Sequence, residues 1–293
     1  MKNLLFHILS VYFIFSSCTA PIEINTKNSD PVPIIYGYIT DQNIKQYIRI
    51  LSSSPYFEEI KESAIDNADV SIADAEGENY IFNYTEDGYY ESVLAFAAKE
   101  NMKYHLTVEL DFDKDGKTEF YEAETTIPEK VMADSIVINP LTLMGFRHFA
   151  LNLYLQEPAE TKNFYLCKFT INDTISNGKM DEYIIFEDRM INGTYLNGVT
   201  INYFEDATDE KNMQRYDDDN RNQYLVSPGD KIILQVINIE EGYYHFINEC
   251  VREKNGENPF FGGPPSNITT NISNGAVGYF SGYAIQELES VIP

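Results

Sequence analysis

The stretch Tyr104-His105-Leu106-Thr107-Val108-Glu109-Leu110-Asp111-Phe112 alternates between apolar and polar residues over nine positions. Successive side chains of a β-strand point to opposite faces, so this pattern predicts a strand with one buried face and one solvated face. A returning strand is predicted over residues 120–127, and Pro128 ends it. This pair indicates a chain that is mostly β.

Similar short segments precede this pair and define a first domain, residues 33–128. Predicted strands cover residues 32–40, 46–52, 69–72 and 80–84. The last two flank a turn at Gly77, where glycine supplies the positive φ that a hairpin needs. Short strands separated by turn residues are typical of a sandwich, so we predict an immunoglobulin- or transthyretin-like β-sandwich.

A second β-rich domain is predicted over residues 135–293. Its expected strands are residues 149–155, 165–171, 182–188, 199–203, 231–239 and 276–285. Residues 206–221 are highly polar and are predicted to form an exposed excursion.

One helix is predicted at residues 240–254 of this second domain. Apolar residues recur there with helical spacing at Tyr243, Phe246, Ile247, Cys250 and Val251. Acidic residues begin the segment and basic residues end it, which suits the helix dipole. We expect this amphipathic helix to pack its apolar stripe on a sheet.

The N-terminus resembles an export signal followed by a lipid anchor. Residues 1–17 have a positively charged start, an apolar middle and small residues before Cys18, which predicts a signal peptide. The sequence before Cys18 resembles a bacterial lipobox, so we predict cleavage there and lipidation of Cys18. Residues 18–32 are polar and proline-containing, and are predicted to be a tether. An ordinary signal peptide with a free cysteine is the alternative.

The composition limits the classes of partner. The formal net charge is −25, so nucleic acid and anionic lipid surfaces are poor partners, whereas cations or basic protein surfaces suit the envelope better. Cys167 and Cys250 could pair in an exported protein. Because each lies on an apolar face of its own predicted element, we expect two separate thiols.

A candidate calcium loop follows the alternating strand, with the pattern D-x-D-x-D-G-x5-E. In this pattern Asp111, Asp113 and Asp115 supply carboxylates, Lys117 supplies a backbone carbonyl, and Glu122 supplies a bidentate carboxylate. The predicted flanks are strands, so the segment is not an EF-hand. It is either a structural calcium loop at a hairpin tip or an acidic turn that binds no metal.

The catalytic motifs that we considered are missing from the sequence. It contains no His-x-x-x-His pair, nucleophile elbow or glycine-rich phosphate loop. The segment 258–280 is rich in proline and glycine, and Phe260 and Phe261 within it are candidate binding residues. The alternative is that these two phenylalanines pack into the core.

Several turn and strand pieces resemble a known lipoprotein family. They are Cys18 with Pro21-Ile22-Glu23-Ile24, Tyr36-Gly37-Tyr38-Ile39-Thr40-Asp41, Ser54-Pro55-Tyr56-Phe57, Ala68-Asp69-Val70-Ser71-Ile72, Asp134-Ser135-Ile136 and Ser273-Asn274-Gly275-Ala276-Val277-Gly278. In this order they resemble the Bacteroidetes-type lipoprotein family catalogued as domain of unknown function 4249. The resemblance implies an envelope lipoprotein encoded beside outer-membrane TonB-dependent receptors, and it supplies no functional residues.

Together these observations predict a non-enzymatic protein that is anchored by lipid to the outer membrane. We expect a binding or accessory subunit of a TonB-dependent receptor that serves nutrient capture or uptake. A structural or adhesive envelope protein is the alternative, and a hydrolase is the third hypothesis. Acidic residues do not directly follow Cys18, so the sequence leaves the surface face and the periplasmic face of the membrane open.

Overall fold

The computed structural model describes residues 30–54, 62–219, 224–254 and 268–293. The predicted signal peptide, Cys18 and most of the tether lie outside these residues. Phe260 and Phe261 lie outside them too, so their predicted binding role stays a prediction.

The N-terminal half of the described chain consists of short antiparallel strands, as the sequence predicts. These strands are β1 (Pro33–Thr40), β2 (Tyr47–Ser52), β3 (Ser63–Ala64), β4 (Asp69–Asp74), β5 (Asn79–Tyr84), β6 (Tyr89–Ser92), β7 (Lys103–Leu110) and β8 (Glu119–Thr126). The alternating stretch forms β7, in which Tyr104, Leu106, Val108 and Leu110 are buried. The predicted strand with one buried face is confirmed.

The C-terminal half is also mostly β, and the fold class predicted for the whole chain is confirmed. Its strands are β9 (Ala133–Leu143), β10 (Phe146–Gln156), β11 (Phe164–Ile171), β12 (Thr174–Ile175), β13 (Ile184–Glu187), β14 (Tyr195–Asp206), β15 (Leu225–Val226), β16 (Lys231–Ile239) and β17 (Val277–Val291). Its helices are η1 (Met180–Glu182), η2 (Asp188–Met190), α2 (Glu210–Asp219) and α3 (Glu241–Lys254).

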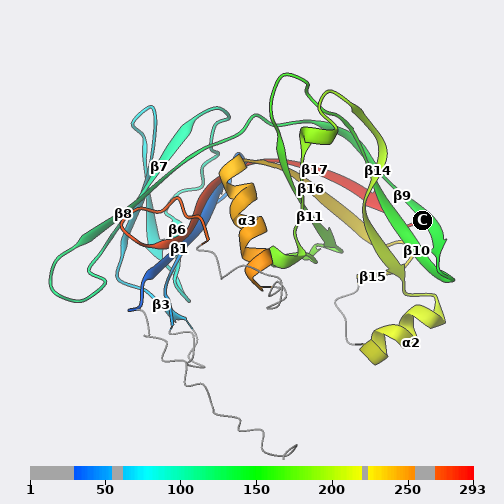
Figure 1. Cartoon of the computed structure of the whole chain (residues 1–293), viewed down its shortest axis with the longest axis horizontal. Helices are drawn as coiled ribbons and strands as arrows, with labels where there is room; N and C mark the ends of the chain where they lie inside the picture. Colours follow the sequence, from blue (N-terminus) through cyan, green and yellow to red (C-terminus); the bar gives the residue numbers. More distant parts are fainter. Residues whose placement is uncertain (1–29, 55–61, 220–223, 255–267) are drawn as a thin grey trace, which may run out of the picture.

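The described strands form two sheets. The larger has 13 strands in the order β12-β11-β16-β17-β1-β2-β6-β5-β4-β7-β8, with β13 beside β11 and β3 beside β2. The smaller contains β15, β14, β10 and β9. The long strand β17 pairs in parallel with β1 and antiparallel with β16, so it runs from one half of the molecule into the other (Figure 1).

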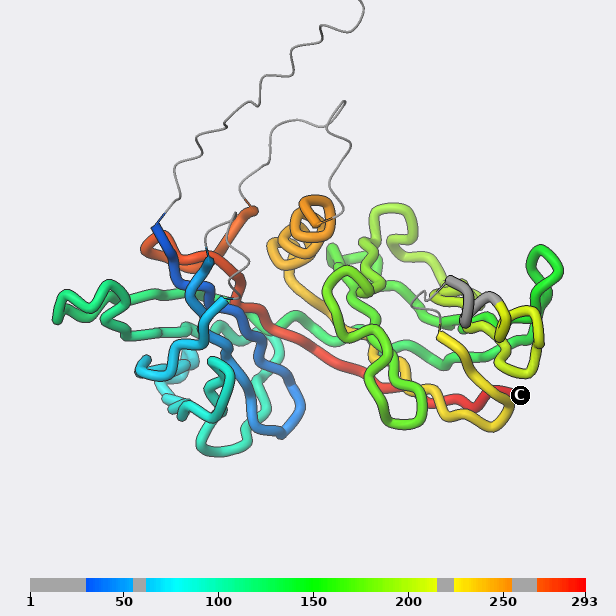
Figure 2. The backbone as a smooth tube through the Cα atoms, turned by 90° about the horizontal axis from the view of Figure 1, so that it is seen from below, coloured from blue at the N-terminus to red at the C-terminus, as the bar shows by residue number. Residues whose placement is uncertain are grey.

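Buried side chains form three clusters on the two faces of this large sheet. The N-terminal core includes Ile35, Val70, Leu106, Ile127 and Phe280, and the C-terminal core includes Leu153, Cys167, Phe204, Leu234 and Val236. A third cluster, the helix-side core, includes Phe164, Leu166, Ile237, Tyr243 and Tyr283. On β17, even-numbered residues contact the first two cores, while odd-numbered residues contact the helix-side core. Figure 2 shows α3 on one side of β17.

The predicted boundary between residues 128 and 135 separates strands but does not separate cores. Phe280 and Ala284 of β17 lie in the N-terminal core, although the sequence-based division assigns them to residues 135–293. Leu288 and Ile292, further along, pack in the C-terminal core. One strand therefore belongs to both halves.

Two local predictions about the second half have different outcomes. The amphipathic helix is confirmed as α3, which buries Tyr243, Phe246 and Ile247 against the helix-side core. The polar excursion predicted at residues 206–221 contains the helix α2, and most of its described side chains are exposed or half-exposed, but Asp206 and Asn212 are buried. The Asn212 amide donates to the backbone carbonyls of Arg147 and Asp206, and these hydrogen bonds satisfy it in its buried position. The polar composition of the segment does not reveal such hydrogen bonds.

Cys167 and Cys250 are both free thiols, as expected from their separate apolar faces. Cys167 is buried in the C-terminal core, whereas Cys250 packs beside the helix-side core. Among the described residues, we find no helix with both the length and the apolar character needed to cross a membrane.

Candidate functional site

A pocket of about 510 Å³ lies on the helix-side face of the large sheet. Its floor comes from five neighbouring strands, β2, β1, β17, β16 and β11, and the segment around Gly178 and Tyr183 adds a wall. Pockets of this size hold small organic molecules, which usually meet apolar walls and a few polar groups. The pocket is therefore our first candidate for a functional site.

Tyrosine rings form most of the wall beside this floor. Tyr38 and Tyr283 stack with centroids 4.2 Å apart and planes 7° apart. Behind them the Tyr283 hydroxyl donates to the Tyr243 hydroxyl at 2.9 Å, and the hydroxyls of Tyr243 and Tyr36 lie 2.5 Å apart. Burial raises the pKa of Tyr36 and of Tyr283 well above the usual value, so these phenols stay neutral.

The pattern of β1 explains how these rings reach the pocket. Ile35 and Ile39 point into the N-terminal core, so Tyr36 and Tyr38 emerge on the opposite face of the same strand. Gly37 between them is closely packed, because a Cβ there would lie 2.4 Å from the Ile48 side chain and 3.0 Å from the Tyr47 carbonyl. The glycine thus lets β2 approach β1 beneath the pocket.

Lys168 of β11 places an ammonium group among these rings. Its Nζ lies 4.5 Å from the ring centroid of Tyr183, 5.1 Å from that of Tyr38 and 5.3 Å from that of Tyr283. Burial lowers the pKa of this lysine to about 8, because desolvation disfavours the charged form. Within the described part of the chain, we find no carboxylate at ion-pair distance from this ammonium.

Two further cations line the pocket at β2, and both have partners. Lys45 pairs with Glu91 at 2.7 Å. Arg49 donates to the Asp87 carbonyl at 3.1 Å and lies 4.7 Å from the centre of the Tyr89 ring. The residues that line the pocket include no Asp, Glu, His, Cys or Ser. The charged side chains of its lining are therefore all cationic.

The second candidate site is the acidic loop between β7 and β8. Lys114 and Gly116 have φ of +60° and +86°, which lets the loop turn back sharply. The Asp111 carboxylate accepts from the Gly116 amide at 3.1 Å, and the Asp113 carboxylate accepts from the Asp115 amide at 3.0 Å. These bonds hold the three aspartates around one turn.

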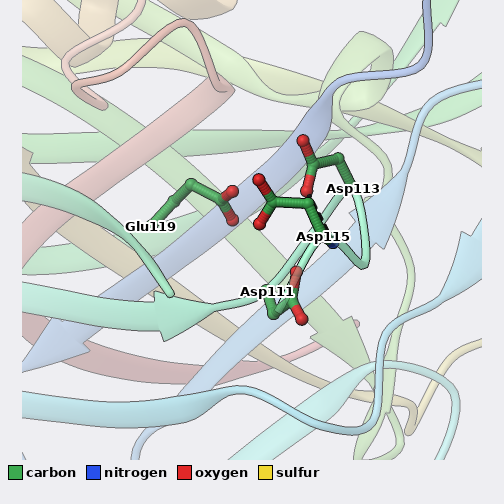
Figure 3. Close-up of side chains that lie close together, drawn as sticks. All are labelled: Asp111, Asp113, Asp115 and Glu119. Atoms are coloured by element: carbon green, nitrogen blue, oxygen red, sulfur yellow. Dashed lines mark hydrogen bonds between the residues drawn. The ribbon is translucent and has the colours of Figure 1, made fainter. Parts of the chain in front are cut away.

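A fourth carboxylate, Glu119, completes this cluster in place of the predicted Glu122. Ligand atoms of Asp111, Asp113, Asp115 and Glu119 lie within 4.8 Å of one another, and their side chains gather at the loop (Figure 3). Glu122 stands on β8, where its carboxylate lies 3.3 Å from His105. Positions 119 and 122 are three residues apart on a strand, so their side chains point to opposite faces. The helical spacing of the calcium pattern therefore does not apply.

One feature of this loop favours a bound cation and another opposes it. One carboxylate oxygen of Asp111, Oδ1, is buried without a hydrogen-bond partner among the described residues, which suits a cation. The Lys117 ammonium, however, lies 2.6 Å from the Asp115 carboxylate and would have to leave before an ion used that oxygen. Whether the loop binds calcium stays a prediction.

The three histidines after Cys18 lie on three different elements and away from the pocket lining. His105 is on β7, His148 is on β10 and His245 is on α3. Their contacts are local: His148 contacts the Phe146 carbonyl, and His245 lies 3.6 Å from Glu241. These contacts do not assemble an acid, a base and a nucleophile around one cavity.

The pocket could not be predicted from local sequence motifs, although one signal was present. Lys168 is a lone charge inside the apolar stretch Phe164-Tyr165-Leu166-Cys167-Lys168-Phe169 of a central strand. Lys168 is half-buried there, and a lysine rarely leaves solvent without a paired charge, so its position marks an unusual environment. The tyrosines that surround it come from residues far apart in sequence, and only the fold brings them together.

Comparisons with known proteins assign a family to the chain. No curated protein matches the sequence. The sequence model of the family described as "Domain of unknown function (DUF4249)" matches residues 19–289. The match covers most of the chain, so the protein belongs to the DUF4249 family.

Proposed function

We propose that this DUF4249 protein is a lipoprotein of the outer membrane that acts as a non-enzymatic binding subunit of a TonB-dependent receptor. The pocket around Lys168 is the observation that carries the binding role. The receptor partnership extends what the family resemblance implied from the sequence, and the anchor is the predicted lipid on Cys18.

The construction of the pocket favours binding over catalysis. Its tyrosine wall is held by ring stacking and by hydroxyl contacts on Tyr243, so the site exists before any ligand enters. Preorganised walls lower the entropic cost of binding. The lining lacks carboxylates, histidines, cysteines and serines, which are the groups that most often act as nucleophiles and bases. A binding protein needs none of them.

Affinity purification tests the partnership. The tagged, lipidated protein is extracted with detergent from the outer membranes of its own cells, and co-eluting proteins are identified by mass spectrometry. We expect a TonB-dependent receptor in stoichiometric amount. The control is Cys18→Ser, which lacks the lipid and should be recovered from the soluble fraction. Recovery of the lipoprotein alone would contradict a stable receptor complex.

A structural or adhesive envelope protein is the second candidate function, and the acidic loop favours it. In this proposal, calcium bound by Asp111, Asp113, Asp115 and Glu119 stiffens the β7–β8 hairpin, and the ion is structural. Calcium-dependent attachment of cells to a polymer or surface, lost on deletion of the gene, would support this function. The same attachment with and without the gene would count against it.

A further inference from the structure

We infer that the pocket binds a small organic anion with a flat, largely apolar body, whose anionic group is met by Lys168. This inference rests on the proposed binding function and specifies its ligand. The geometry points to the ligand through three features: the sign of the pocket's charge, the unpaired state of Lys168, and the flat tyrosine walls.

The charge of the pocket opposes that of the whole protein. The chain carries a net charge of −25, yet the charged residues that line the pocket are Lys45, Arg49 and Lys168. An acidic envelope repels anions at long range, but this repulsion is screened beyond about 8 Å at physiological ionic strength. Glu91 neutralises Lys45, but no carboxylate among the described residues lies at ion-pair distance from Arg49 or Lys168, so an anion is favoured beside Lys168.

Lys168 differs in its partners from most of the eleven other described lysines; Lys211 donates to the Gly145 carbonyl, and Lys114 is exposed to solvent. The other nine lie within 4.0 Å of a carboxylate, namely Lys45, Lys99, Lys103, Lys117, Lys130, Lys162, Lys179, Lys231 and Lys254. Lys168 instead lies over the ring faces of Tyr38, Tyr183 and Tyr283, where the attraction is of the cation–π kind. Burial still lowers the pKa of Lys168 to about 8, so the ammonium is mostly charged at neutral pH but has no anionic partner among the described residues. A ligand carboxylate would supply the missing counter-charge.

The walls specify the body of the ligand. The stacked pair Tyr38 and Tyr283 and the nearby ring of Tyr183 present flat surfaces around the ammonium. Planar groups bind such surfaces by offset stacking or edge contacts. Ile237 and Ile285 add apolar surface on the same floor. An aromatic or similarly flat acid fits both the charge and these walls.

The protonation state of Lys168 should control anion binding, because the described groups that face this lysine are uncharged. They are the phenols of Tyr38 on β1, Tyr183 after η1 and Tyr283 on β17, all with pKa values raised by burial and therefore neutral. From β16 comes the Gln235 amide, which donates to the Glu287 carboxylate of β17 at 2.8 Å. From α3, behind the rings, comes the neutral Tyr243 phenol. Anion affinity should therefore fall as Lys168 loses its proton.

Isothermal titration calorimetry with matched probes tests this inference. The mature chain carrying Cys18→Ser is titrated with 2-naphthoate and indole-3-acetate, and with the primary amide of each acid, which has nearly the same shape and no charge. We expect each acid to bind at least about tenfold more tightly than its amide, because the charge-assisted contact is lost in the amide. The affinity for the acids should weaken at least about fivefold between pH about 7 and pH about 10.

Two variants separate the role of Lys168 from a general charge effect. Lys168→Met keeps the side-chain length and should abolish the preference for the acids. Lys162→Met is the matched control, since Lys162 also lies over a ring, that of Phe164 at 4.9 Å, but on the surface and paired with Glu241. It should bind like the wild type. A thermal melt of each variant shows that it is folded.

The outcomes distinguish this inference from the proposed function. Equal affinity for acids and amides, or an unchanged preference in Lys168→Met, overturns the anion. Binding of none of the probes overturns the class of flat organic acids. In each case, recovery of a TonB-dependent receptor in the affinity purification would leave the receptor partnership standing, because that experiment does not depend on the ligand.

Discussion

Replacement of Gly278 by alanine tests how β17 joins the two halves of the molecule. Gly278 pairs with Ile35 in the parallel ladder between β17 and β1. Its φ is +115°, and a Cβ at this position would lie 2.0 Å from the Ile35 carbonyl oxygen. This neighbour is backbone, so the contact can be relieved only if β1 and β17 move apart.

The expected cost of Gly278→Ala follows from two contributions. The backbone conformation is essentially restricted to glycine and costs another residue about 2 kcal/mol. Separation of the strands loses about two ladder hydrogen bonds at about 1 kcal/mol each, which gives a total of about 4 kcal/mol. For a protein of this size, that loss lowers the melting temperature by about 10 °C.

The assay is thermal unfolding of the Cys18→Ser protein, followed by far-ultraviolet circular dichroism. Gly275→Ala is the matched control, because Gly275 also has a positive φ, +77°, but a Cβ at this position would have no neighbouring atom within 4 Å. Only the backbone cost of about 1 kcal/mol applies to it, so its melting temperature should fall by about 3 °C. Equal shifts in the two variants would refute the reasoning that β1 and β17 are closely paired at Gly278.

Three further predictions concern the two candidate sites. Asp113→Asn should weaken calcium binding by about tenfold or more in calorimetry with calcium chloride, whereas Glu122→Gln should not change the affinity. If the wild type does not bind at millimolar calcium, the acidic loop is not a calcium site. Tyr243→Phe should lower the free energy of unfolding, measured by urea denaturation, by about 1–3 kcal/mol, because it removes the hydroxyl that contacts the hydroxyls of Tyr36 and Tyr283. An unchanged free energy of unfolding would show that water replaces these hydrogen bonds. The pKa of Lys168 is lowered to about 8 in the folded state, so above that pH the unfolded state binds more protons than the folded state. The free energy of unfolding should therefore rise from about pH 8 towards pH 10, relative to that of Lys168→Met. Parallel curves of stability against pH for the two proteins would contradict this sign.

The sequence predicts those parts of the fold that depend on local periodicity. The alternation at residues 104–112 predicts β7, and the helical spacing from Tyr243 to Val251 predicts α3. Each of these elements buries one face, and that face is visible in the spacing of its apolar residues. The mostly β class follows from the same patterns.

The arrangement of β17 could not be predicted in the same way. Its parallel pairing joins Ile34 to Val277 and Thr40 to Tyr283, which are far apart in the chain. The expected strand at residues 276–285 had no feature that identified its partner or its continuation to Val291. Pairing over such separations depends on the packing of both cores at once, which spacing within a single strand does not encode.

The candidate sites show the same division between local and distant information. The acidic pattern located the loop correctly, but the switch from Glu122 to Glu119 depends on where β8 begins. The pocket requires Tyr38, Lys168 and Tyr283 to meet across three strands, and no local motif contains them. The net charge of −25 suggested cationic or basic partners, whereas the pocket favours an anion. Net charge describes the envelope, and a site is decided by the few groups that line it.

The most direct test of ligand binding in the pocket is to identify what the protein carries in its own membrane. Tagged wild-type, Lys168→Met and Lys162→Met proteins are purified from native outer membranes and denatured, and the released small molecules are compared by mass spectrometry. We expect an organic acid that is enriched with the wild type and with Lys162→Met and is lost from Lys168→Met. The same molecules from all three proteins, or none from the wild type, would contradict a binding function for this pocket.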